Sequence, residues 1–130
     1  NTFKIMETKS LSLSKSDFKL LKEHLEKSNM SAYNKEKLSN ELKEATIYSE
    51  EELPSDVVCL KSEARIANTK TGQEFTFKLV MPEEANIKVQ KVSVFAPIGI
   101  ALFGYRTNDI ITWEMPDGLQ EFKILSVNRM

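Results

Sequence analysis

The chain has 130 residues, of which 41% are hydrophobic and 28% are charged, and its formal net charge is -1 at pH 7. This size and composition are typical of one globular domain with room for a small additional unit. Because 18 basic residues nearly balance 19 acidic ones, no global positive field favours nucleic acid or anionic lipid. No apolar run approaches the roughly 20 residues of a membrane-spanning helix. We therefore expect a cytoplasmic protein without membrane contact.

Residues that could carry catalytic or metal chemistry are scarce. The chain has one histidine, His24, and one cysteine, Cys59, and a zinc site needs several such ligands. His24 lies among charged residues in a predicted helix, where a solvated or half-buried side chain is the common situation. Cys59 lies in the apolar run "DVVCL", which indicates a buried structural thiol in a reducing compartment. The four glycines form no phosphate-binding loop. We therefore predict no catalytic site, no cofactor, no metal and no enzymatic activity.

The N-terminal part has the apolar spacing of two amphipathic helices. The repeating positions are Phe18, Leu21 and Leu25 in the first helix and Leu38, Leu42 and Ala45 in the second. Either Ser14 or Ser16 can cap the first helix, and the small and polar run "KSNMSAYN" at 27–34 can connect two antiparallel neighbours. Ser49 and Glu52 have the spacing of a capping box before Pro54. We therefore predict a short helical hairpin within an N-terminal region, residues 1–52.

Residues 53–130 are predicted to form a second unit that is rich in β-strands. Phe75, Phe77 and Leu79 alternate with polar residues, as in a strand with one buried face. The same alternation continues at Val92 and Val94, at Ile111, Trp113 and Met115, and at Phe122, Ile124 and Val127. "NTKTGQ" has the glycine of a hairpin loop that joins "EARIA" to the first of these strands, and "PDG" turns the last two. The pattern predicts an antiparallel sheet.

One short, buried helix is predicted between the strands, in "PIGIALF". Pro97 suits the first helical position because its missing N–H would be unpaired there anyway. Gly104 suits a stop in the left-handed conformation. The predicted fold class is thus α+β, with a short N-terminal helical hairpin followed by an antiparallel sheet that carries one short helix.

The segment from Leu53 to Leu125 resembles the C-terminal domain of the Gre transcript-cleavage factors. The resemblance rests on "SVFAPIGIALFG" at 93–104, on Asn108-Asp109 and on "MPDG" at 115–118, which occur in the family's order and spacing. "EELPSDVV" and the short hairpin are similar to the branch named regulator of nucleoside diphosphate kinase. The resemblance implies an FKBP-like domain that docks on core RNA polymerase at the mouth of its secondary channel, with the hairpin projecting from the domain.

The resemblance also implies which residues contact the polymerase. The family presents to it the corner between a strand and the short helix, and here this corner carries Phe95, Ala96, Pro97 and Ile98. Ala96 stands where the family usually has a Ser that would cap the helix. Asn108 stands where a Gly is usual, and Asn tolerates a left-handed conformation.

The tip of the predicted hairpin departs from the family pattern. Gre proteins that stimulate RNA cleavage carry acidic residues at the tip of a long coiled coil, where they help to hold a magnesium ion. The tip at 27–34 has no acid, the nearest being Glu26 and Glu36, and arms of about 12 to 15 residues span only roughly 18 to 22 Å. Both the reach and the chemistry that cleavage needs are therefore missing.

We accordingly expect a monomeric, RNA polymerase-binding elongation regulator that acts at the secondary channel, does not stimulate cleavage and reads no DNA sequence. The alternative is an interaction module of FKBP-like fold with another partner. A prolyl isomerase is disfavoured because the motifs match Gre proteins rather than isomerases.

Overall fold

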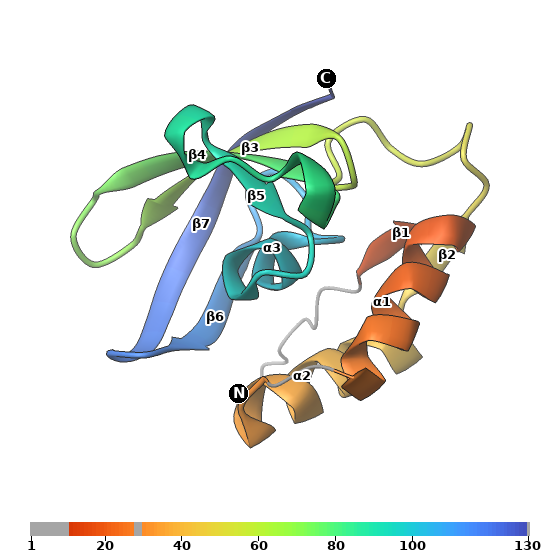
Figure 1. Ribbon diagram of the computed structural model, residues 1–130, viewed down its shortest axis with the longest axis horizontal. Helices are drawn as coiled ribbons and strands as arrows, with labels where there is room; N and C mark the ends of the chain where they lie inside the picture. The colour runs from red at the N-terminus through yellow and green to blue at the C-terminus, as the bar shows by residue number, and fades with distance from the viewer. Residues whose placement is uncertain (1–10, 28–29, 130) are drawn as a thin grey trace, which may run out of the picture.

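The computed structural model describes residues 11–27 and 30–129 and shows helices packed against a curled sheet (Figure 1). The N-terminal elements are β1 (Ser12–Ser14), α1 (Lys15–Lys27), α2 (Ala32–Lys43) and β2 (Thr46–Tyr48). The sheet domain comprises β3 (Ser62–Asn68), β4 (Glu74–Val80), two 3₁₀ turns at Pro82–Glu84 and Ile87–Val89, β5 (Lys91–Ser93), α3 (Pro97–Leu102), β6 (Ile110–Met115) and β7 (Gly118–Arg129). The mixture of helices and sheet agrees with the predicted class.

Each N-terminal helix begins at a serine whose side chain satisfies a free backbone donor. The Asp17 N–H donates to Ser14 Oγ at 3.1 Å, so Ser14, and not Ser16, caps α1. The Asn34 N–H donates to Ser31 Oγ at 3.2 Å at the start of α2. Ser16 instead donates to Glu50 Oε2 at 2.9 Å. The predicted connection at 27–34 includes residues 28 and 29, which lie outside the described residues.

The strands that flank the two helices were not predicted. β1 and β2 pair in parallel, with Leu13 opposite Ile47. Between β2 and Pro54 lies the predicted turn, which the Glu52 N–H closes by donating to the Ser49 carbonyl oxygen at 3.2 Å. The N-terminal part is therefore a helical pair framed by a small parallel ribbon.

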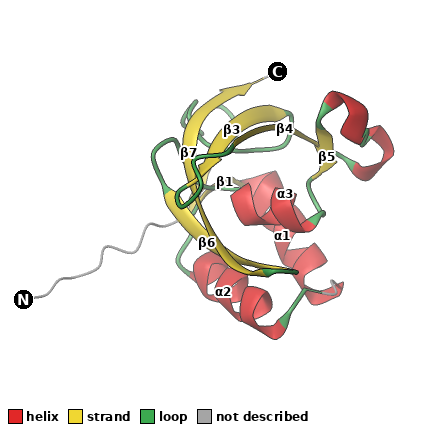
Figure 2. Ribbon diagram, turned by 90° about the vertical axis from the view of Figure 1, so that its left-hand side faces the viewer, coloured by secondary structure: helices red, strands yellow, loops and turns green. Residues whose placement is uncertain are grey.

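The main sheet has the strand order β5-β4-β3-β7-β6 and curls around α3 (Figure 2). The two predicted hairpins are confirmed, because β3 pairs antiparallel with β4 and β6 pairs antiparallel with β7, ending at Met115 opposite Gly118. The prediction of an entirely antiparallel sheet is wrong at β5, which runs parallel to β4. The two 3₁₀ turns carry the chain back between these strands, and a parallel pair requires such a crossover.

The hydrophobic core continues from the sheet domain into the N-terminal part. Leu13 and Leu21 are 1% exposed and belong to the same buried cluster as Trp113 and Phe103. Gly104 ends α3 with φ 87°, as predicted, and a Cβ there would lie 2.9 Å from Leu13 Cδ2. β1 therefore packs against the end of α3 at a position that only glycine can occupy without strain.

A side-chain amide joins α2 to the open edge of the sheet. β6 is an edge strand, and the Asn34 Nδ2 donates to the Glu114 carbonyl oxygen at 3.0 Å. In return the Glu114 N–H donates to Asn34 Oδ1 at 3.0 Å. Because Asn34 is only 4% exposed, its amide takes the place that a neighbouring strand would occupy.

Further contacts hold α2 against the sheet domain. The Tyr105 hydroxyl donates to the Glu41 carboxylate at 2.5 Å, and Lys37 Nζ lies 2.6 Å from Glu41 Oε2 and 3.1 Å from the Tyr105 hydroxyl. Burial beside the Glu41 carboxylate raises the pKa of Tyr105, which keeps this phenol protonated. The resemblance implied a hairpin that projects from the domain. In the structure the helix pair instead packs against it (Figures 1 and 2).

The structure also bears on the predicted cysteine and on membrane contact. Cys59 is buried, and burial raises the pKa of its thiol, as expected for an inert structural cysteine. In the part of the chain that the structure describes, no helix combines the length and apolarity that a membrane crossing requires.

Substituting Asn34→Ala should lower the free energy of unfolding by about 1 to 2 kcal/mol, because both backbone groups of Glu114 would lose their partner. Urea unfolding followed by circular dichroism measures this. Asn40→Ala, on an exposed position of the same helix, is the matched control and should leave stability nearly unchanged. Equal stability of the two variants would show that the amide does not anchor α2.

Candidate functional site

The candidate site is the corner where β5 passes into α3. Three of the four predicted residues, Phe95, Ala96 and Ile98, are half-buried, while Pro97 is exposed. Pro97 occupies the first turn of α3, as predicted, and Ala96 is the N-cap with φ -68° and ψ 154°. No side chain accepts a capping hydrogen bond at Ala96, so this helix begins without the usual stabilisation.

The backbone of the corner is fixed by Ser93 and Gly99. The Phe95 N–H donates to Ser93 Oγ at 3.0 Å, and the Ala96 N–H donates to the Ser93 carbonyl oxygen at 3.0 Å. A Cβ at Gly99 would lie 2.4 Å from that same carbonyl oxygen. The strand can therefore approach the helix this closely only because residue 99 has no side chain.

Phe95 faces α1. Its ring stacks on the imidazole of His24, with ring centroids 4.1 Å apart and planes inclined by 16°. Burial lowers the pKa of His24 below its ordinary value, because desolvation disfavours the charged ring. His24 is half-buried, as predicted, and the structure adds its contact with the corner, which the sequence did not indicate.

Ile98 faces a different surface, an open groove of ≈ 480 Å³ on the inner side of the sheet. The apolar side chains that line this groove are Ile66, Phe75, Phe77, Ile98, Met115 and Phe122. Phe75 and Phe77, on the predicted buried face of their strand, are half-buried and pack against the core. α3 has 6 residues, about 9 Å of helix, and its residue Ile98 forms one side of this groove opposite the sheet.

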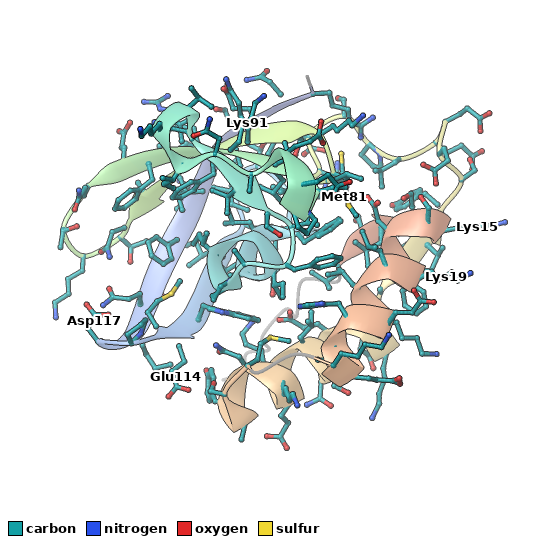
Figure 3. All side chains as sticks on the ribbon, viewed as in Figure 1. Lys15, Lys19, Met81, Lys91, Glu114 and Asp117 are labelled. Carbon is teal, nitrogen blue, oxygen red and sulfur yellow. The ribbon has the colours of Figure 1, made fainter. Side chains whose placement is uncertain are left out.

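The polar lining of the groove comes from the two hairpin turns and from the strand ends beside them. Asn68 Nδ2 donates to Gln120 Oε1 at 3.0 Å across the end of the groove, while Asn68 Oδ1 accepts from the N–H groups of Lys70 and Thr71. Asp117, at the tip of the β6–β7 hairpin (Figure 3), also lines the groove. An apolar floor with a few polar rim groups is typical of a binding surface rather than a catalytic centre.

The described residues contain no group of three or more His, Cys, Asp or Glu side chains that could hold a metal ion. The corner itself carries no titratable side chain, since its four residues are Phe95, Ala96, Pro97 and Ile98. Its surface can thus contribute apolar contact and shape, but no acid, base or nucleophile.

Comparison with known proteins identifies the family. The family model for "Transcription elongation factor, GreA/GreB, C-term" matches residues 53–129. The chain belongs to the GreA/GreB family. Among curated relatives, the transcription elongation factors GreA of Clostridium beijerinckii and of Clostridium botulinum (strain Hall) are 34% and 37% identical over 92 residues. The matched segment covers 71% of this chain but only 58% of the length of those GreA proteins.

Two solved structures have a fold similar to that of this chain. A GreA/GreB elongation factor from Nitrosomonas europaea is 30% identical, with a TM-score of 0.69, and the match covers 93% of this chain and 99% of that one. GreA factor homolog 1 of Thermus thermophilus is 21% identical, with a TM-score of 0.50, and the match covers 92% and 99%. At this lower identity the second structure supports the fold alone.

Ala96, the N-cap of α3 without a side-chain capping hydrogen bond, gives a direct test of the corner. Ala96→Ser should raise the free energy of unfolding by about 0.5 to 1 kcal/mol, because a Ser hydroxyl at this N-cap can accept from a free N–H in the first turn of α3. Chemical denaturation measures the change. A variant that is less stable than the parent would mean that residue 96 does not occupy a capping position.

Proposed function

We propose that this protein binds core RNA polymerase at the entrance of its secondary channel and regulates elongation without stimulating transcript cleavage. The family match over 53–129 supports a role in elongation. Because the chain spans little more than half of the curated GreA proteins, the activity of those whole proteins is not transferred to it. The proposal rests on the corner for binding and on the helix pair for the absence of cleavage.

The corner offers a rigid apolar surface of the kind that protein partners use. Ile98 and Phe95 are half-buried on a backbone that Ser93 and Gly99 hold in place. Such preorganised apolar side chains lose little conformational entropy on binding. We assign the polymerase contact to Phe95, Ala96, Pro97 and Ile98.

The helix pair is short, and the segment that connects its helices has no acids for metal-assisted cleavage. α1 and α2 have 13 and 12 residues, roughly 18 to 20 Å each, and Asn34 ties the start of α2 to the edge of β6. The segment 27–34 has no acid. A metal ion assists phosphodiester hydrolysis only when its ligands are placed within a fraction of an ångström, so this helix pair is unsuited to the task.

We also assign the protein to the branch named regulator of nucleoside diphosphate kinase and its sheet domain to the FKBP-like folds. The support is the short N-terminal helical pair together with the match that covers nearly the whole of both this chain and the Nitrosomonas europaea protein. Under this assignment we expect a monomer that works in the cytoplasm beside the polymerase.

Replacing Ile98→Asp should weaken binding to core RNA polymerase at least tenfold, because a carboxylate would have to be desolvated in an apolar contact. Surface-immobilised core polymerase and the purified protein give the affinity directly. The matched control is Ile110→Asp, at a 54% exposed isoleucine on β6, which should bind as the parent does. A folded Ile98→Asp protein with undiminished affinity would remove Ile98 from the site.

Added with magnesium to a backtracked elongation complex, the protein should leave the rate of transcript cleavage at its intrinsic value. The same protein should slow cleavage stimulated by an added GreA protein, since both would compete for one docking position on the polymerase. Gel analysis of the labelled transcript measures both rates. Accelerated cleavage by this protein alone would contradict the proposal.

A further inference from the structure

The C-terminal end of α1 forms a small surface pocket together with the corner. The pocket has a volume of ≈ 200 Å³ and is lined by Leu20, Glu23, His24, Lys27 and Phe95. Four of its five residues come from α1, and only Phe95 comes from the sheet domain. The surface next to the assigned docking residues is therefore built by the N-terminal helix.

The ring stack fixes the orientation of Phe95. With 4.1 Å between the centroids, the imidazole of His24 covers one face of the Phe95 ring, and the Phe95 backbone is held by Ser93 Oγ. An aromatic side chain restrained at both its ring and its backbone is ready to contact a partner without further ordering. Without His24, nothing else in the pocket lining could stack on this ring, since the other members are Leu20, Glu23 and Lys27.

We propose that α1 completes the polymerase-docking surface: an apolar side chain of core RNA polymerase enters the pocket beside Phe95, and His24 is the positioning residue that holds the Phe95 ring for this contact. The inference rests on the proposed function and extends it from the corner to the helix. The walls of the pocket are apolar or aromatic at Leu20, His24 and Phe95. The rim carries one acid, Glu23, and one base, Lys27. A charged side chain of the partner would meet one like and one opposite charge there, so its net electrostatic attraction would be small.

The continuity of the surface selects this face of α1. Phe95 belongs both to the corner and to the pocket, so a partner that covers Phe95, Pro97 and Ile98 also meets the end of α1. Lys19, by contrast, lies on the outer side of α1 and points away from the sheet domain (Figure 3). Lys19 and Lys27 are both exposed, but only Lys27 lines the pocket. Lys27 therefore lies inside the proposed contact and Lys19 lies outside it.

The experiment measures the affinity of variants of the 130-residue chain for core RNA polymerase. Lys27→Trp places a bulky side chain over the pocket and should weaken binding at least tenfold, whereas the matched Lys19→Trp should bind as the parent does. His24→Ala removes the stack and should weaken binding severalfold, while His24→Phe restores a flat ring and should recover most of the loss. Circular dichroism checks that each variant is folded.

Two results together would support the inference. His24→Phe would regain the affinity that His24→Ala loses, and Lys27→Trp would lose affinity while Lys19→Trp would not. If Lys27→Trp and His24→Ala bind as the parent does while Ile98→Asp loses affinity, the docking surface stops at the corner and the inference is wrong. If Ile98→Asp also binds normally, the assignment of the corner is wrong as well. The affinity of Ile98→Asp thus separates a failure of the inference from a failure of the proposed function.

Discussion

The arrangement of the molecule depends on how the open edge of β6 is satisfied. An edge strand presents unpaired N–H and C=O groups, and burying them without partners would cost about 1 to 3 kcal/mol for each group. Here the amide of Asn34 supplies one donor and one acceptor to Glu114. Because Asn34 lies in the first turn of α2, the same two hydrogen bonds that satisfy Glu114 at the sheet edge also hold the helix pair against the sheet.

A fixed helix pair determines what the corner can offer to a partner. With α2 held by Asn34 and by the Glu41–Tyr105 contact, α1 is held next to α3, and His24 reaches Phe95. A pair that projected freely would leave Phe95 without its stacking partner. The proposed docking surface is therefore a product of packing between two segments that are far apart in the chain, and it needs no rearrangement to form.

The sequence predicted best those features that depend on a residue's own backbone geometry. Pro97 begins α3, Gly104 ends it with φ 87°, and Asn108 has φ 78°, because the steric preferences of these residue types act locally. The parallel pairing of β5 and the strands β1 and β2 were missed, since strands of 3 residues are too short for an alternating pattern to show. The contacts of Asn34 with Glu114 and of His24 with Phe95 could not be predicted. Each joins a helix to a strand or corner far away in the chain, and no local sequence pattern indicates it.

The same distinction explains why the chemistry of the site was foreseen better than its extent. That the corner lacks acids, bases and nucleophiles follows from the identity of four consecutive residues, whereas the groove beside Ile98 depends on side chains that the fold brings together from β3, β4, β6 and β7. Ile98 lines the open groove and Phe95 stacks on His24, so the corner at the start of α3 presents two different apolar surfaces. A partner that engages both surfaces gains mainly apolar contact. This favours a protein surface over a nucleic acid, because phosphates would meet a single lysine, Lys27, in the pocket beside Phe95, and the acid Glu23 lines the same pocket.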